Sequence, residues 1–185
     1  IAVSRHDSER AFTLLKGIVT DRSLDSEVRA RALFALGRGE QGQKLGAVLE
    51  DVIRNERDPE VLEAALFALS NVEGDLPGRI FLDLIKDPSC DEDVRVQALF
   101  LAGRENLLTA PVLQEIYDSS DNLQMKEQVC HVASLLDDEQ AALDVLLHIA
   151  RTEQDPSLRR AAIFWIGECD DPRAADFLIE VINEE

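Results

Sequence analysis

The sequence predicts an all-α protein, an α-solenoid built from tandem two-helix repeats. Three observations support this fold class. Five thirteen-residue segments align without a gap, starting at Asp25, Asp58, Asp91, Asn122 and Asp155. These starts are 33, 33, 31 and 33 residues apart, a period typical of helical repeat proteins. No segment alternates apolar and polar residues with the period of two that a β-strand requires.

The first helix of each repeat has clear start signals. The Asp or Asn at each starting position can cap a helix, because its side-chain oxygen accepts an otherwise unpaired backbone N–H. Pro59 and Pro156 suit the first helical position, where no amide hydrogen is needed. Glu27, Glu60 and Asp93 place negative charge in the first turn, which the helix dipole favours. A helix is therefore predicted directly after each starting residue.

The second helix of each repeat is predicted from a recurring Leu-x-x-Ile/Val pattern. Polar breaks such as "NVEGD", "KDPSCD" and "DSSDN" separate it from the first helices. The pattern occurs at Leu15 and Ile18, Leu49 and Val52, Leu82 and Ile85, Leu113 and Ile116, Leu146 and Ile149, and Leu178 and Val181.

The aligned segments resemble the HEAT and HEAT-like repeats, including those first described in phycobilin lyases. They follow the consensus D-x-x-V-R-x-x-A-x-x-A-L-G. Arg29, Arg95 and Arg159 match its arginine, Lys126 is a conservative variant, and Leu62 departs from it. The resemblance covers essentially the whole chain and implies a right-handed superhelix of about five and a half repeats. It also implies that the arginines are structural and pair with Asp side chains or backbone carbonyls of neighbouring units.

One domain is expected over residues 1–185, with repeat units at 1–21 (partial), 22–57, 58–90, 91–121, 122–154 and 155–185. Residues 7–18 align with residues 171–182, which makes Ile1 to Ser4 the end of a preceding inner helix. We therefore expect this sequence to be a piece of a longer chain. A cytoplasmic location is the default expectation, and a missing leader would also permit the cell envelope or secretion.

Aromatic residues recur on the side of the first helix that faces away from its expected core. At 100° per residue, Val28, Ala32 and Leu36 form the buried seam, and Phe34 lies roughly opposite. The equivalent positions in the next four repeats hold Phe67, Phe100, His131 and Phe164.

The resemblance implies that this column lies along the concave side of the superhelix, where partners of HEAT proteins bind. The charged rim of the expected binding surface consists of Glu27, Glu60, Glu63, Arg38 and Arg104. An aromatic stripe with such a rim is typical of a groove for a peptide or a helix. The rings could instead stack between adjacent repeats and form a second core, and the sequence leaves both alternatives open.

The charge of the chain limits the kinds of partner that it can bind. Asp and Glu outnumber Lys and Arg by 37 to 19, so the formal net charge is −18. This charge repels phosphate backbones, which argues against nucleic-acid binding and would suit a basic partner. No apolar run approaches the ~20 residues of a membrane helix, so membrane insertion is not expected.

Catalytic and metal-binding patterns are missing from the sequence. Cys90, Cys130 and Cys169 lack zinc-ligand spacing, and Cys130 is predicted to be a core thiol. His6, His131 and His148 form neither HExxH nor a His-Glu pair. We therefore predict no cofactor, no metal and a non-catalytic scaffold that binds a protein or peptide partner. The alternative is a HEAT-repeat lyase or chaperone-like protein that handles a cofactor or chromophore, and a third reading is a spacer between domains.

Overall fold

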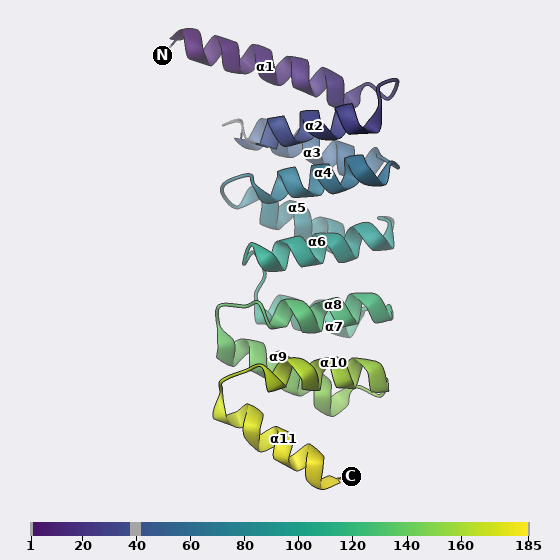
Figure 1. Cartoon of the computed structure of the whole chain (residues 1–185), viewed down its shortest axis with the longest axis vertical. Coiled ribbons are helices and arrows are strands. Elements are labelled where there is room, and N and C mark those ends of the chain that lie inside the picture. The colour runs from purple at the N-terminus through teal and green to yellow at the C-terminus, as the bar shows by residue number, and fades with distance from the viewer. Residues whose placement is uncertain (1, 38–41, 185) are drawn as a thin grey trace. The chain divides into compact units, whose positions relative to one another are not determined.

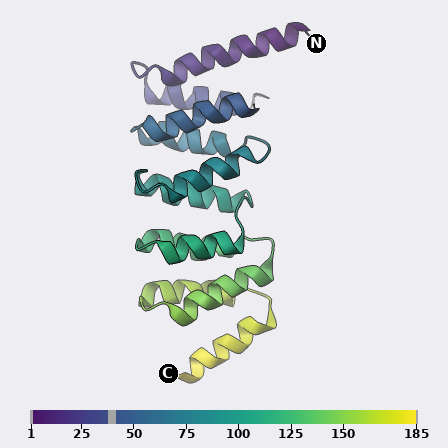
Figure 2. The same cartoon turned by 180° about the vertical axis from the view of Figure 1, so that it is seen from behind.

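The computed structural model describes the backbone of residues 2–37 and 42–184, and the side chains of residues 9–37 and 44–183. All regular structure in these residues is α-helical (Figures 1 and 2). The helices are α1 (Ala2–Thr20), α2 (Ser26–Gly37), α3 (Gly42–Asn55), α4 (Pro59–Ser70), α5 (Leu76–Lys86), α6 (Glu92–Arg104), α7 (Ala110–Ser119), α8 (Leu123–Ala133), α9 (Glu139–Thr152), α10 (Pro156–Gly167) and α11 (Pro172–Glu184). The predicted all-α fold class is confirmed.

The chain divides into two compact units, an N-terminal unit of residues 1–101 and a C-terminal unit of residues 102–185. In the N-terminal unit, α2 contacts α1 and α4, and α3 contacts α4 and α5. Helices α2 and α4 lie in one layer, with α3 and α5 behind them (Figure 1). The core between these layers includes Leu33, Leu49, Leu66 and Phe81, all fully buried.

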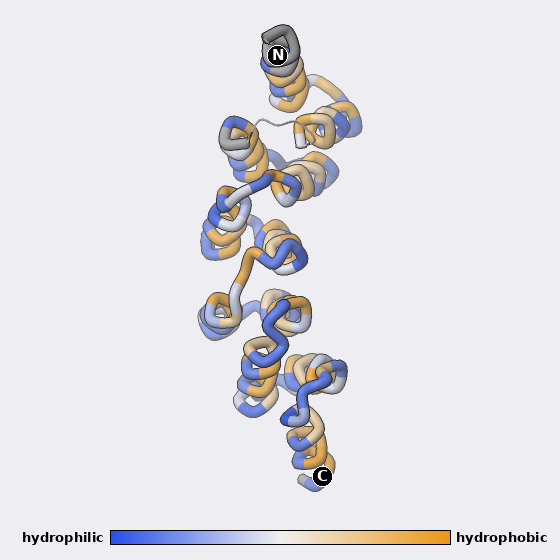
Figure 3. Tube along the Cα trace, turned by 90° about the vertical axis from the view of Figure 1, so that its left-hand side faces the viewer, coloured by the Kyte–Doolittle hydropathy of each residue, from blue (hydrophilic) through white to orange (hydrophobic). Residues whose placement is uncertain are grey.

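In the C-terminal unit, α8 contacts α7, α9 and α10, while α10 also contacts α9 and α11. Leu113, Met125, Val129 and Leu143 are buried among these helices. Figure 3 shows hydrophobic and hydrophilic residues interspersed along each helix, as expected when one side of a helix is buried and the other is open to solvent. No helix in the described part of the chain is long and apolar enough to cross a membrane.

The predicted capping residues act as expected at the start of each first helix. The Asp58 carboxylate accepts the N–H groups of Glu60 and Val61, and the Asp155 carboxylate accepts those of Ser157 and Leu158. The Asn122 side chain accepts the N–H of Met125. These bonds satisfy amides that the helix itself leaves unpaired, so the local sequence sets where each helix begins.

Small residues allow first helices of consecutive repeats to approach closely. A Cβ atom on Gly37 would lie 3.1 Å from the Ala68 Cβ, in the adjacent helix. A Cβ on Gly103 would lie 2.3 Å from a Val132 methyl carbon, so that contact requires glycine. A Cβ on Gly167, by contrast, would meet no atom within 4 Å.

Two expectations about the beginning of the chain are wrong. Residues 2–20 form one continuous helix, so Ala2 to Ser4 do not end a separate inner helix, and Ile1 lies outside the described residues. Val28 was expected in the buried seam but is exposed. Val61 and Val94, at the same position in the next two repeats, are buried. Val28 differs because α1, the helix that packs against α2 on its N-terminal side, leaves the Val28 side chain uncovered.

Candidate interaction surface

Phe34 on α2 and Phe67 on α4 lie side by side on the surface of the N-terminal unit. Their ring centroids are 5.6 Å apart with an interplanar angle of 62°, an edge-to-face contact. Phe34 nevertheless remains 45% exposed and Phe67 40% exposed. The two rings therefore contact each other and still present apolar surface to solvent, so contact between repeats does not hide them as a core would.

These rings line an open groove of about 870 Å³ between α2 and α4. Gly37 and Ala68, where the two helices approach each other closely, also line this groove. We call it the N-terminal aromatic groove, and it is lined by Arg31, Phe34, Ala35, Gly37, Phe67, Ala68 and Asn71. Phe100, the third member of the column, lies on α6 in the same unit and is half-buried.

A second groove, of about 420 Å³, lies between α8 and α10 in the C-terminal unit. His131 stacks on Trp165 with ring centroids 5.1 Å apart and an interplanar angle of 12°. Phe164 makes an edge-to-face contact with Trp165 at 5.0 Å and is 60% exposed. We call this the C-terminal aromatic groove, and it is lined by Gln124, Glu127, Gln128, His131, Ala161, Phe164 and Trp165.

Trp165 is a site residue that the sequence prediction missed. Helix geometry places it beside the seam, at the position that Ala35 and Ala68 occupy in earlier repeats. A large ring cannot fit into a space that holds a methyl group, so it lies half-buried over His131 at the edge of the groove. The signal was available, because Trp165 is the single tryptophan of the chain and is larger than every other residue of its column, Ala35, Ala68, Leu101 and Val132.

The charged rim residues do not converge on the rings. Glu27 pairs with Arg31 on the same helix, and the Glu60 carboxylate accepts the Ser26 hydroxyl. Glu63 is exposed, and Arg104 pairs with Glu105 in the C-terminal unit. Of these residues, only Arg31 lines an aromatic groove. Arg38 lies outside the described residues.

The cations of the seam hold neighbouring repeats together. Arg29 is buried, donates from Nε to the Val19 carbonyl at 3.0 Å, and forms an ion pair with Glu56. Arg95 makes the equivalent Nε bond to the Ile85 carbonyl at 2.9 Å. The structural role expected for these two residues is confirmed. Arg159 differs, since it is exposed, and the position equivalent to Glu56 would fall beyond residue 185.

Lys126 takes the place of arginine in the C-terminal unit. Its ammonium donates to the Glu153 carboxylate at 3.2 Å, and the Tyr117 hydroxyl donates to the same oxygen. The second oxygen of Glu153 accepts the backbone N–H groups of Gln154 and Asp155. The bond from the Asp155 amide, followed by that from Tyr117, lowers the pKa of Glu153 to about 2. Glu153 is thus held ionised as a structural anchor.

The described residues offer little for catalysis by a thiol or a metal. Cys130 is buried, and burial raises its pKa to about 12. Burial also raises the pKa of the Cys90 and Cys169 thiols, which are half-buried. All three therefore carry little of the nucleophilic thiolate at neutral pH. Within residues 9–37 and 44–183, no three His, Cys, Asp or Glu side chains cluster as metal ligands would.

The comparison with known families agrees with the repeat architecture. No curated protein sequence matches the chain at a significant level. The family model described as PBS lyase HEAT-like repeat matches residues 158–184, which span most of α10 and all of α11. The match begins three residues after Asp155 and lies in the last of the five aligned repeats, whose other members begin at Asp or Asn and recur every 31 or 33 residues. The all-helical structure of the described residues and the HEAT-like repeat match over residues 158–184 are together consistent with an α-solenoid.

Proposed function

We propose that the chain is a non-catalytic interaction module that binds a protein or peptide partner through its aromatic grooves. The observation that carries this proposal is the pair Phe34 and Phe67, whose rings touch while close to half of each remains exposed. Exposed apolar area of this kind contributes about 25 cal/mol per Å² when a partner covers it. The concave position of the rings, which the family resemblance implies, remains a prediction.

The way in which the rings are held favours recognition of a partner. They stand on helices rather than loops, and the close contact of Gly37 with Ala68 fixes the separation of α2 and α4. A surface that is already ordered loses little conformational entropy on binding, which leaves more of the contact energy as affinity. The C-terminal aromatic groove repeats the arrangement with His131, Phe164 and Trp165.

Charge favours an apolar segment with basic flanks as the partner. Glu27, Glu60 and Glu63 lie on the same two helices as Phe34 and Phe67 without lining the groove, and Arg31 is the one charged residue among the described ones that lines it. The whole chain carries a formal charge of −18, which attracts basic segments from a distance. We expect the bound segment to place an aromatic or branched apolar side chain against the rings.

Selection from a phage-displayed peptide library tests this proposal. The wild-type chain is the bait, and clones are then compared on Phe34→Ser/Phe67→Ser and on Leu14→Ser. Leu14 is an exposed apolar residue on α1, in the same unit but outside the groove, and serves as the matched control. We expect selected peptides to combine an apolar anchor with Lys or Arg and to lose binding only to the double variant. Peptides that bind all three baits equally would refute the proposal.

The alternative reading is a protein that handles a cofactor or chromophore, as the word lyase in the matched family's description suggests. Purified chain should then show visible absorption or stoichiometric metal, with the bound group lost from variants of an aromatic groove. An absorption spectrum without bands at wavelengths longer than the protein's own absorption favours the interaction module.

A further inference from the structure

A second candidate site lies at the loop edge of the N-terminal unit, away from the rings. It follows from the seam column, where Arg29 and Arg95 donate to a carbonyl in the last turn of the preceding helix, and Lys126 donates to Glu153 in a neighbouring loop. Two of these cations meet a glutamate 27 residues further on, as in the pairs Arg29–Glu56 and Lys126–Glu153. The seam therefore has a recurring position for a buried or half-buried cation.

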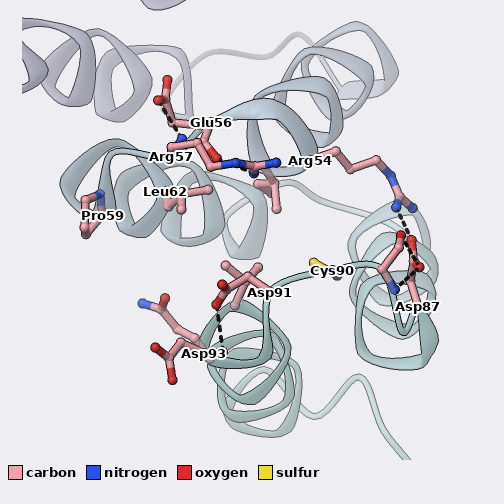
Figure 4. A pocket seen from close by; sticks show the side chains of 13 residues that line it. Arg54, Glu56, Arg57, Pro59, Leu62, Asp87, Cys90, Asp91 and Asp93 are labelled. Atoms are coloured by element: carbon pink, nitrogen blue, oxygen red, sulfur yellow. Dashed lines mark hydrogen bonds and ion pairs between the residues drawn. The ribbon is translucent and has the colours of Figure 1, made fainter.

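The second repeat lacks both members of this pair. Leu62 occupies the position of Arg29, and Ser89, 27 residues on, occupies that of Glu56. Leucine is shorter than arginine and carries no donor, so the space that the Arg29 side chain fills in the first repeat is left open here. The structure has a cavity of about 620 Å³ at this place, lined by Leu62 and Ser89 among others (Figure 4).

The cavity has an apolar floor and an acidic wall. Pro59 and the half-buried Leu62 supply apolar surface, which suits the methylene stem of a long side chain, while Ile53 and Val94 are only 2% and 6% exposed. Figure 4 shows Leu62 facing the loop that carries Cys90 and Asp91. Asp91 and Asp93 stand on this side of the cavity, at the start of α6.

Internal pairs account for most of the other charges that line the cavity. Arg54 donates to the Asp87 carboxylate at 2.7 Å and to Glu50 at 3.2 Å, and Glu56 is paired with Arg29. Arg57 donates to the Glu56 backbone carbonyl at 2.9 Å. Asp91 accepts the backbone N–H of Asp93 at 3.0 Å as the cap of α6. The remaining charges that line the cavity are this carboxylate, the Asp93 carboxylate and the guanidinium of Arg57.

We propose that this cavity receives an arginine side chain from a partner polypeptide, which takes the place that Arg29 fills inside the first repeat. The arginine stem lies on Leu62, and its guanidinium lies in the part of the cavity that Ser89, Asp91 and Asp93 line. The site is separate from the aromatic grooves and does not depend on their role.

Chemical-shift titration of the ¹⁵N-labelled chain tests the proposal. The probe is Nα-acetyl-arginine N-methylamide, and the control is the citrulline analogue, which has nearly the same shape without the charge. The arginine probe should shift the amide signals of residues 89–94 in a saturable manner, with an affinity about fivefold above that of the citrulline probe. Equal shifts with the two probes, or no shift with either, would overturn the proposal.

Two neighbouring acidic residues provide a matched pair of variants. Asp93 lines the cavity, whereas Glu92, in the same first turn of α6, does not. Asp93→Asn should weaken the arginine probe about threefold, and Glu92→Gln should leave its affinity unchanged. Leu62→Arg with Ser89→Glu should rebuild the internal pair, fill the cavity and abolish the shifts. Equal effects of Asp93→Asn and Glu92→Gln would show that the probe responds only to overall charge.

Discussion

Arg29 and Glu56 form a buried ion pair inside the N-terminal unit, with 7% and 8% of their side chains exposed. Arg29 also donates to the carbonyl of Val19 at the end of α1. The second oxygen of Glu56 accepts the backbone N–H groups of Arg57 and Asp58, directly before α4. The pair thus ties the end of α1 and the connection between α3 and α4 to helix α2.

Removal of Arg29 is expected to destabilise the N-terminal unit strongly. Arg29→Met leaves the Glu56 carboxylate buried without its cation, and breaking such a pair costs about 3–5 kcal/mol. Urea denaturation measures the loss. Arg31→Met is the control, since Arg31 forms an exposed pair with Glu27 on the same helix and should cost under about 1 kcal/mol. Similar losses for both variants would contradict the anchoring role of Arg29.

The contribution of Glu153 to stability should depend on pH. Its pKa in the folded chain, about 2, lies below the ordinary value of 4.5, so folding favours the ionised form. The stabilisation is therefore fully present above about pH 5 and declines as the pH falls toward 2. Urea midpoints of the wild type and of Glu153→Gln should differ clearly at about pH 6, and the difference should be markedly smaller at about pH 3. A difference that does not change with pH would contradict this assignment.

Phenylalanines inside and outside the core should differ in their effect on stability. Phe164 is 60% exposed, so Phe164→Ala should cost about 1 kcal/mol or less. Phe81 is fully buried, and Phe81→Ala should cost about 3–5 kcal/mol. Thermal melting of the two variants makes the comparison. Comparable losses would indicate that Phe164 belongs to a second core.

Two glycines at the ends of first helices should respond oppositely to alanine. Gly103→Ala forces a Cβ against Val132 and should cost about 1–3 kcal/mol through overpacking. Gly167→Ala meets no neighbour and should stabilise the chain by about 0.4–1 kcal/mol, because it restricts the unfolded chain. Chemical denaturation of both variants measures these changes. Destabilisation by Gly167→Ala would contradict the finding that a Cβ at this position meets no neighbour.

Much of the fold follows from local signals in the sequence. The capping residues and the prolines at Pro59 and Pro156 fix where helices begin, because they satisfy or remove amides that would otherwise lack a partner. The seam arginines also follow from pattern, since a buried cation requires an acceptor. By contrast, the exposure of Val28 depends on how much of α2 is covered by α1, and the sequence pattern of α2 alone does not reveal this.

The site was only partly predictable for a related reason. The periodicity places Phe34 and Phe67 away from the core, but whether their rings meet depends on the distance between α2 and α4. Trp165 was missed because its angle on the helix assigns it to the seam, whereas its size keeps it at the surface. Glu56 and Glu153 lie in connections, outside the aligned segments, and their role becomes visible only from the backbone amides around them.

The central claim, that the aromatic grooves bind a partner, is tested most directly by the affinity of a library-selected peptide for four forms of the chain. These are the wild type, Phe34→Ser/Phe67→Ser, Phe164→Ser and the Leu14→Ser control. Trp165 lies in the C-terminal aromatic groove, so its fluorescence also reports occupation of that groove. We predict at least about tenfold weaker binding to one of the ring variants, about 1.4 kcal/mol, and unchanged binding to Leu14→Ser. Equal affinity of all four forms would contradict the claim.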